Sequence, residues 1–223
     1  MFRIKICGVT RVTDARLVAL AGADAVGLNF CPASSRYIDL ATADKIVSVL
    51  PERIAKVGVF VNASAEEIQH VADRLGLDWI QLHGDEPPKM LAQLGDRSIV
   101  RAFRFGDNGA GEISRYLEAC RAEVRLPDAV LVDACQPGKY GGTGLTADWK
   151  AVAETYDAFA PLPWVLAGGL TPFNVGDAIA VANPFAVDVA SGVESRPGMK
   201  DPLLVRAFVS ASRKAFAERD RSD

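Results

Sequence analysis

The sequence predicts an α/β fold, a TIM (β/α)8 barrel of eight parallel strands in a single domain over residues 1–223. Short runs of apolar and β-branched residues alternate about eight times with stretches of helical periodicity. The 223 residues, 49% of them hydrophobic, suffice for one substantial core, and no linker rich in Pro, Gly or Ser divides them. An open doubly wound sheet uses the same units, but eight units of about 28 residues favour closure.

The expected strands are mostly continuous apolar runs, as is typical of a parallel sheet covered on both faces. They are residues 2–8, 24–30, 54–62, 78–84, 98–105, 129–134, 163–170 and 185–192. In such a barrel, catalytic groups lie at the carboxyl ends of the strands, whereas the loops at the other end mostly serve stability. The residues at the strand ends are therefore the candidates for function.

Capping residues mark the ends of two early helices. Thr13 is expected to cap the first helix, which stops near Gly22. Ser64 and Glu67 have the spacing of a capping box, and the helix that they begin closes at Gly76.

The last two helices are each preceded by a capping side chain and a proline. Thr171 comes before Pro172 and Asp201 before Pro202, and proline is preset for the first helical turn. The chain is expected to fray over about residues 219–223, because the ending is polar and charged.

Charge and cysteine usage exclude several classes of protein. A net charge of −3 and a pI near 5.5 argue against nucleic-acid binding, which needs a basic face. No signal peptide or membrane-spanning run is evident, so we expect a cytoplasmic protein without a membrane partner. No cysteine pair or histidine has metal-ligand spacing, so we expect neither a metal nor disulfides, and free thiols at Cys7, Cys31, Cys120 and Cys135.

Glycine clusters follow the last three expected strands. A phosphate needs converging backbone N–H groups, and glycine allows that close approach. One such cluster is more often only a turn, but three at consecutive strand ends indicate a phosphate site in the last loops of a barrel. The first half lacks this pattern, which points to a substrate with one phosphate. The candidate residues are Gly142, Thr143, Gly144, Gly168, Gly169, Ser191 and Gly192.

Two strand ends carry groups suited to acid–base chemistry. Asp133 follows a buried strand, where partial desolvation would favour a protonated carboxyl and a general acid, although a lone Asp is more often a cap or loop residue. Cys7 ends the first strand, and a thiolate is a competent base, although a buried cysteine is usually just a small hydrophobe. Their placement at strand ends favours catalysis for both.

Two further polar residues, Arg36 and His83, each have two possible roles, and a third, His70, has one. Arg36 can hold a carboxylate through a two-pronged contact or be a solvated loop arginine. His83 lines the mouth or bonds the loop that begins the fourth helix, and we favour the mouth. His70 has polar neighbours in a helical segment and is expected at the surface.

Six motifs together resemble the phosphoribosylanthranilate isomerases of tryptophan biosynthesis, in the family's order and over nearly the whole chain. They are KICGVT, LNFCPASSRYI, QLHGDE, VDA followed by GGTG, LAGGL and VDVASGVESRPGMKD. The chain departs from the family at Cys31, where an aromatic residue is common, and at residues 34–36, where Ser-Ser-Arg replaces Ser-Pro-Arg but keeps the arginine. Cys135-Gln136 is a third departure.

The resemblance implies an Amadori rearrangement of N-(5-phosphoribosyl)anthranilate without a cofactor. It implies Asp133 as the general acid that opens the furanose ring and Cys7 as the base that removes the C2 proton. Arg36 would hold the anthranilate carboxylate, the glycine loops would hold the phosphate, and Asp188 would orient nearby polar groups. The expected partner is thus a small molecule with one phosphate and one carboxylate.

Other functions share parts of this pattern. The aminoaldose isomerase of histidine biosynthesis resembles a twofold-repeated barrel with two phosphate sites and an aspartate in place of Cys7. Tryptophan synthase α and pentose-phosphate epimerases share the late glycine loops but need other acids, bases or metal-binding histidines. A non-enzymatic alternative is a catalytically silent barrel that binds a sugar phosphate. The sequence allows a monomer or a homodimer.

Overall fold

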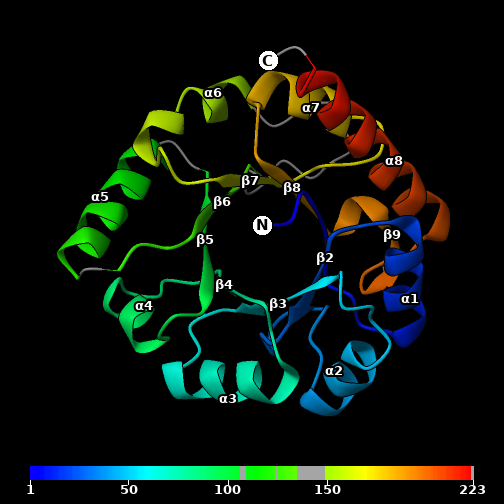
Figure 1. Cartoon of the computed structure of the whole chain (residues 1–223), viewed down its shortest axis with the longest axis horizontal. Helices are drawn as coiled ribbons and strands as arrows, with labels where there is room; N and C mark the ends of the chain where they lie inside the picture. The colour runs from blue at the N-terminus through cyan, green and yellow to red at the C-terminus, as the bar shows by residue number, and fades with distance from the viewer. Residues whose placement is uncertain (106–108, 124, 135–148, 222–223) are drawn as a thin grey trace.

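Eight parallel strands close into a barrel in the chain order β1 to β8, and β1 pairs with both β2 and β8. The computed structural model describes residues 1–105, 109–123, 125–134 and 149–221. Figure 1 shows the strands as a central ring, with the helices around its outside. The predicted TIM (β/α)8 barrel is confirmed.

Every barrel strand lies within the range predicted for it. The strands are β1 Ile4–Cys7, β2 Ala25–Asn29, β3 Ala55–Phe60, β4 Trp79–Leu82, β5 Ser98–Arg104, β6 Ala129–Asp133, β7 Trp164–Ala167 and β8 Ala186–Val189. An antiparallel hairpin after β8, formed by β9 Glu194–Arg196 and β10 Met199–Lys200, was not predicted. Its strands are too short and polar to show an apolar pattern.

The α-helices cover the outside of the barrel. They are α1 Val12–Ala21, α2 Leu40–Val47, α3 Ala65–Leu75, α4 Lys89–Gln93, α5 Gly109–Ala122, α6 Trp149–Ala153, α7 Val175–Ala182 and α8 Pro202–Arg219, with short 3-10 turns η1 Tyr156–Ala158 and η2 Ser191–Val193. None of the described helices is long and apolar enough to span a bilayer.

The predicted caps are right at two helices and wrong at two others. Ser64 Oγ accepts from Glu67 N, and the Asp201 carboxylate accepts from the first turn of α8. Thr13 does not cap α1, because the helix already begins at Val12 and its N-cap residue is Arg11. Thr171 does not cap α7 either, because the Asn174 side chain closes a turn onto Thr171 N and delays the helix to Val175.

Two apolar clusters make up the core. The larger packs the outward faces of the strands against the helices and includes Ile4 and Ile6 of β1. The smaller fills the barrel itself, and at its amino end the Phe2 ring meets the Trp79 ring edge-on at 5.8 Å. Side chains alternate along a strand, so Cys7 lies on the inward face of β1, toward the open end of the barrel.

The chain beyond α8 is tied to its beginning. Arg219 is the last residue of α8, and the carboxylate of the next residue, Asp220, lies 2.8 Å from the guanidinium of Arg3. This contact lies within the range, about residues 219–223, over which fraying was expected.

Candidate active site

Cys7 lies at the carboxyl end of β1, and the neighbouring strand leaves room for its sulfur. Its register partner on β2 is Gly27, where an added Cβ would stand 2.6 Å from Cys7 Sγ. Burial is the largest influence on the Cys7 thiol and raises its pKa, while the Lys5 ammonium acts in the opposite direction. Cys7 is a free thiol that is only partly exposed.

Asp133 and His83 face each other across the mouth. His83 Nε2 lies 3.9 Å from Asp133 Oδ2, and the two side chains are 23% and 27% exposed. The other ring nitrogen, Nδ1, accepts from Gln81 Nε2 at 2.8 Å. Burial lowers the pKa of His83, so the imidazole is neutral and carries its proton on Nε2, toward Asp133.

Arg36 lies in the loop after β2, and its guanidinium is held by Glu194 of β9. The contact is two-pronged, with Nε to Oε1 at 2.8 Å and Nη2 to Oε2 at 2.6 Å. Its aliphatic stem crosses Gly8, which has φ +72°, and a Cβ there would come within 2.4 Å of Arg36 Cδ. Gly8 therefore lets the arginine lie directly beside the end of β1.

Glu194 also receives a second cation. Lys200 Nζ lies 2.8 Å from Glu194 Oε1 and donates to the carbonyl of Ala190 at 3.1 Å. Burial raises the pKa of Glu194, but Arg36 and Lys200 together outweigh it and keep the pKa below its usual value. The hairpin thus fixes Arg36 in one position at the mouth.

Asp188 lies inside the barrel rather than at its rim. Its carboxylate is 2.9 Å from the ammonium of Lys5, and both side chains are almost completely buried. The register of β1 and β8 places these two residues side by side. Asp188 therefore pairs with Lys5, deeper in the barrel than Cys7.

The loops after β7 and β8 meet at a glycine. A Cβ on Gly192 would stand 1.8 Å from the carbonyl oxygen of Leu170, so no larger residue fits there. Gly168 and Gly169 both have positive φ, +89° and +66°, and Ser191 begins the turn η2. The structure brings these two predicted phosphate loops into contact. The third, with Gly142, Thr143 and Gly144, lies outside the described residues.

Sequence reasoning missed three charged residues near Cys7: Lys5, Glu194 and Lys200. Lys5 had a local signal: it is a lysine inside an apolar strand, two residues before a candidate base. Residues two apart in a strand point to the same face, so Lys5 shares the face of that base. The contact of Glu194 with Arg36 spans 158 residues and follows no periodic pattern. His70, expected at the surface, is exposed on α3.

Comparison with known proteins gives one consistent result. A family model described as N-(5′-phosphoribosyl)anthranilate (PRA) isomerase matches residues 4–211. The N-(5′-phosphoribosyl)anthranilate isomerase of Neisseria meningitidis is 42% identical over 214 residues, which are 95% of this chain and 97% of that one.

Solved structures agree with the sequence comparison. Phosphoribosyl anthranilate isomerase from Thermotoga maritima has a TM-score of 0.84 at 38% identity, with 96% of this chain and 100% of that chain covered. A structure of such an enzyme in complex with reduced 1-(o-carboxyphenylamino)-1-deoxyribulose 5-phosphate has a TM-score of 0.81 at 36% identity, with the same coverage. The chain belongs to the phosphoribosylanthranilate isomerase family.

Proposed function

We propose that this chain performs its family's reaction in tryptophan biosynthesis with Asp133 as general acid and Cys7 as general base. The substrate is N-(5′-phosphoribosyl)anthranilate and the product is 1-(2-carboxyphenylamino)-1-deoxyribulose 5-phosphate. The supporting observation is the placement of the two groups. They end β6 and β1, three strands apart around a closed barrel, so they reach one mouth from different walls.

The first step is ring opening. The protonated carboxyl of Asp133 donates to the furanose ring oxygen while the anthranilate nitrogen supplies electrons and the bond between C1′ and the ring oxygen breaks. The result is an iminium ion and a free hydroxyl. His83 lies beside Asp133 as a neutral ring with Nε2–H toward it, and we assign His83 to substrate binding at this wall.

The second step is removal of the C2′ proton by the thiolate of Cys7. The iminium draws electrons from the C2′–H bond, and the pair forms the C1′=C2′ bond of an enolamine. Loss of the C2′ hydroxyl proton and protonation of C1′ then give the ketone. Because burial raises the pKa of the Cys7 thiol, the site needs positive charge near the sulfur, which the iminium supplies in this step.

Substrate binding uses the ends of the molecule. Glu194 occupies Nε and Nη2 of Arg36, which leaves other guanidinium N–H groups for the anthranilate carboxylate. We assign the phosphate to Gly142, Thr143, Gly144, Gly168, Gly169, Ser191 and Gly192. Contact between the β7 and β8 loops supports that assignment, because backbone N–H groups from both loops can then reach one anion.

The test is the decay of substrate fluorescence with purified protein and matched variants. Cys7→Ala and Asp133→Asn should each lower kcat by about 10²- to 10⁴-fold, whereas Cys31→Ala and Asp85→Asn, at nearby loop positions, should not. Arg36→Ala should chiefly raise KM. Near-normal kcat in Cys7→Ala would remove Cys7 as the base. A folded wild type that binds substrate without turnover would indicate a silent binding barrel.

We also propose a cytoplasmic location, since Cys7, Cys31 and Cys120 are free thiols, as in reducing compartments. Analytical ultracentrifugation distinguishes the monomer from the homodimer.

A further inference from the structure

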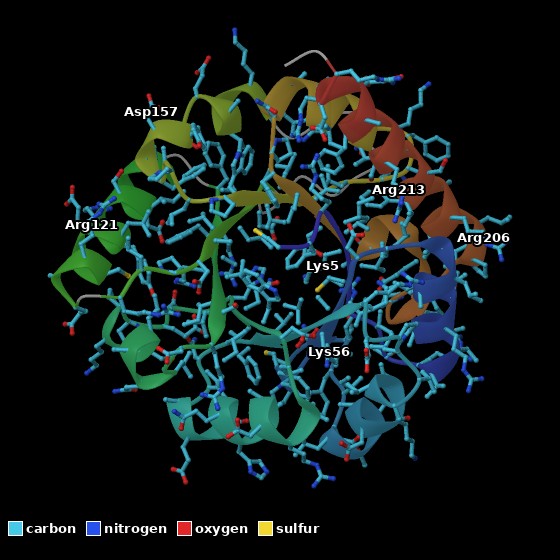
Figure 2. All side chains as sticks on the ribbon, in the orientation of Figure 1. Lys5, Lys56, Arg121, Asp157, Arg206 and Arg213 are labelled. Carbon is cyan, nitrogen blue, oxygen red and sulfur yellow. The ribbon has the colours of Figure 1, made fainter. Side chains whose placement is uncertain are left out.

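A buried ion pair lies in the barrel beneath Cys7, and the acid and base steps do not use it. Lys5 Nζ is 2.9 Å from Asp188 Oδ1, with side chains 0% and 8% exposed. Lys5 lies near the centre of the ring of strands (Figure 2). It precedes Cys7 by two residues, so both side chains share the inward face of β1. Burying an ammonium is costly, and an apolar pair would fill this space at lower cost.

The ammonium of Lys5 is not fully satisfied by Asp188. Lys5 Nζ lies 2.9 Å from Asp188 Oδ1, a contact that can use one of its N–H donors. An ammonium has three N–H donors. Burial lowers the pKa of Lys5, but Asp188 and then Cys7 outweigh that effect, so Lys5 stays charged. The donors of Lys5 can therefore serve a second anion on the Cys7 side.

The charges around Cys7 leave a place for one more anion. The charged neighbours on its side of the mouth are Lys5 on β1, Asp188 on β8, Glu194 on β9, Lys200 on β10 and Arg36 after β2. Across the mouth lie neutral His83 and the carboxyl group of Asp133. The near side has three cations and two carboxylates, so a thiolate at Cys7 would neutralise it.

We propose that Lys5 is a positioning residue whose ammonium, anchored by Asp188, stabilises the thiolate of Cys7 from inside the barrel. The inference rests on the proposed role of Cys7 as base. Lys5 has no exposed surface, so its effect on the reaction passes through the sulfur rather than through the substrate. Among the influences on the pKa of Cys7, burial raises it most and Lys5 lowers it most.

The direct test follows Cys7 alkylation by iodoacetamide against pH, read for the Cys7 peptide by mass spectrometry. In Lys5→Met, the midpoint should rise by about one to three pH units. The rising limb of the plot of kcat/KM against pH should shift to higher pH by the same amount. At pH values below both midpoints, kcat/KM should fall about tenfold for each pH unit of that shift. Activity should recover at high pH with KM unchanged. Lys5→Arg, which keeps the cation, should retain a midpoint near that of the wild type.

The matched control is Lys56→Met, which removes a lysine near the amino end of β3 whose Nζ lies 3.5 Å from Asp78. Its Cys7 midpoint should equal the wild-type value. If Lys5→Met does not fold, the double variant Lys5→Met/Asp188→Asn takes its place, because replacing both members of a buried pair is usually tolerated. Lys5 affects Cys7 more than Asp188 does, so this variant should show a smaller rise.

An unchanged Cys7 midpoint in a folded variant without Lys5 would overturn the inference. Turnover that survives in Cys7→Ala would instead overturn the role of Cys7 as base. That result comes from a different protein and a different assay, so the two failures are distinguishable.

Discussion

The loop that carries His83 depends on another buried ion pair, outside the barrel wall, and the loss of this pair should be costly. Arg101 on β5 contacts Glu86 at 3.2 Å, and the two side chains are 6% and 0% exposed. The guanidinium also donates to the carbonyls of Leu82 and Gly84, at 3.0 and 2.9 Å. These contacts fix the chain on both sides of His83.

Arg101→Met removes the charge and the donors but retains an apolar stem. It leaves the Glu86 carboxylate buried without its guanidinium partner, while backbone N–H groups such as Gly84 N, at 2.9 Å, still donate to it. Breaking a buried pair in this way costs about 3 to 5 kcal/mol of unfolding free energy. With a urea m-value of about 2 kcal/mol/M, the unfolding midpoint should fall by about 1.5 to 2.5 M.

The assay is urea unfolding followed by circular dichroism, with Arg74→Met as the control. Arg74 pairs with Asp44 on the surface, where both side chains are well exposed, and such a pair is worth about 0 to 1 kcal/mol. Arg101→Met/Glu86→Gln should recover part of the loss, because no buried charge is left alone. A midpoint for Arg101→Met equal to that of Arg74→Met would refute the reasoning.

Three further predictions follow from single residues. Gly27→Ala should lower kcat by about 100-fold, because its Cβ would stand 2.6 Å from Cys7 Sγ and displace the sulfur; an unchanged kcat would contradict this placement. Asp201→Ala should cost about 1 kcal/mol through loss of the α8 cap, so calorimetry should give a melting temperature about 2 to 4 °C lower, and no decrease would mean that the cap is dispensable. The pKa of Glu194 is lower in the folded chain than its usual 4.5, so its stabilising effect is present above pH 4.5 and is lost as the pH falls through the folded value. In Glu194→Gln, the unfolding free energy should therefore decrease less steeply as the pH falls. A decrease as steep as that of the wild type would contradict this prediction.

The barrel could be predicted because its signals are local. Each strand is an apolar run, and each carboxyl end can be read from the residues that follow it. The positions of Cys7 and Asp133 at the mouth follow from that pattern alone. Two helix starts were misjudged: α1 already begins at Val12, before Thr13, and the contact of Asn174 with Thr171 N delays α7.

The partners of the site residues could not be predicted in the same way. Arg36 reads as a free loop arginine until the hairpin brings Glu194 against it. Asp188 reads as a group at the end of β8, yet the register with β1 turns it toward Lys5 inside the barrel. Such contacts depend on barrel closure, which brings together residues that are far apart in the sequence.

The surroundings of Cys7 are supplied by both ends of the chain. Lys5 lies in the first strand, and Lys200, the second lysine that lowers the pKa of Cys7, lies in the last hairpin. These lysines are separated by about 195 residues, which take about 10 to 40 s to synthesise at about 5 to 20 residues per second. For that time the nascent chain holds Cys7 without Lys200, so a ribosome-bound or prematurely terminated chain that ends before β9 lacks part of this charge cluster.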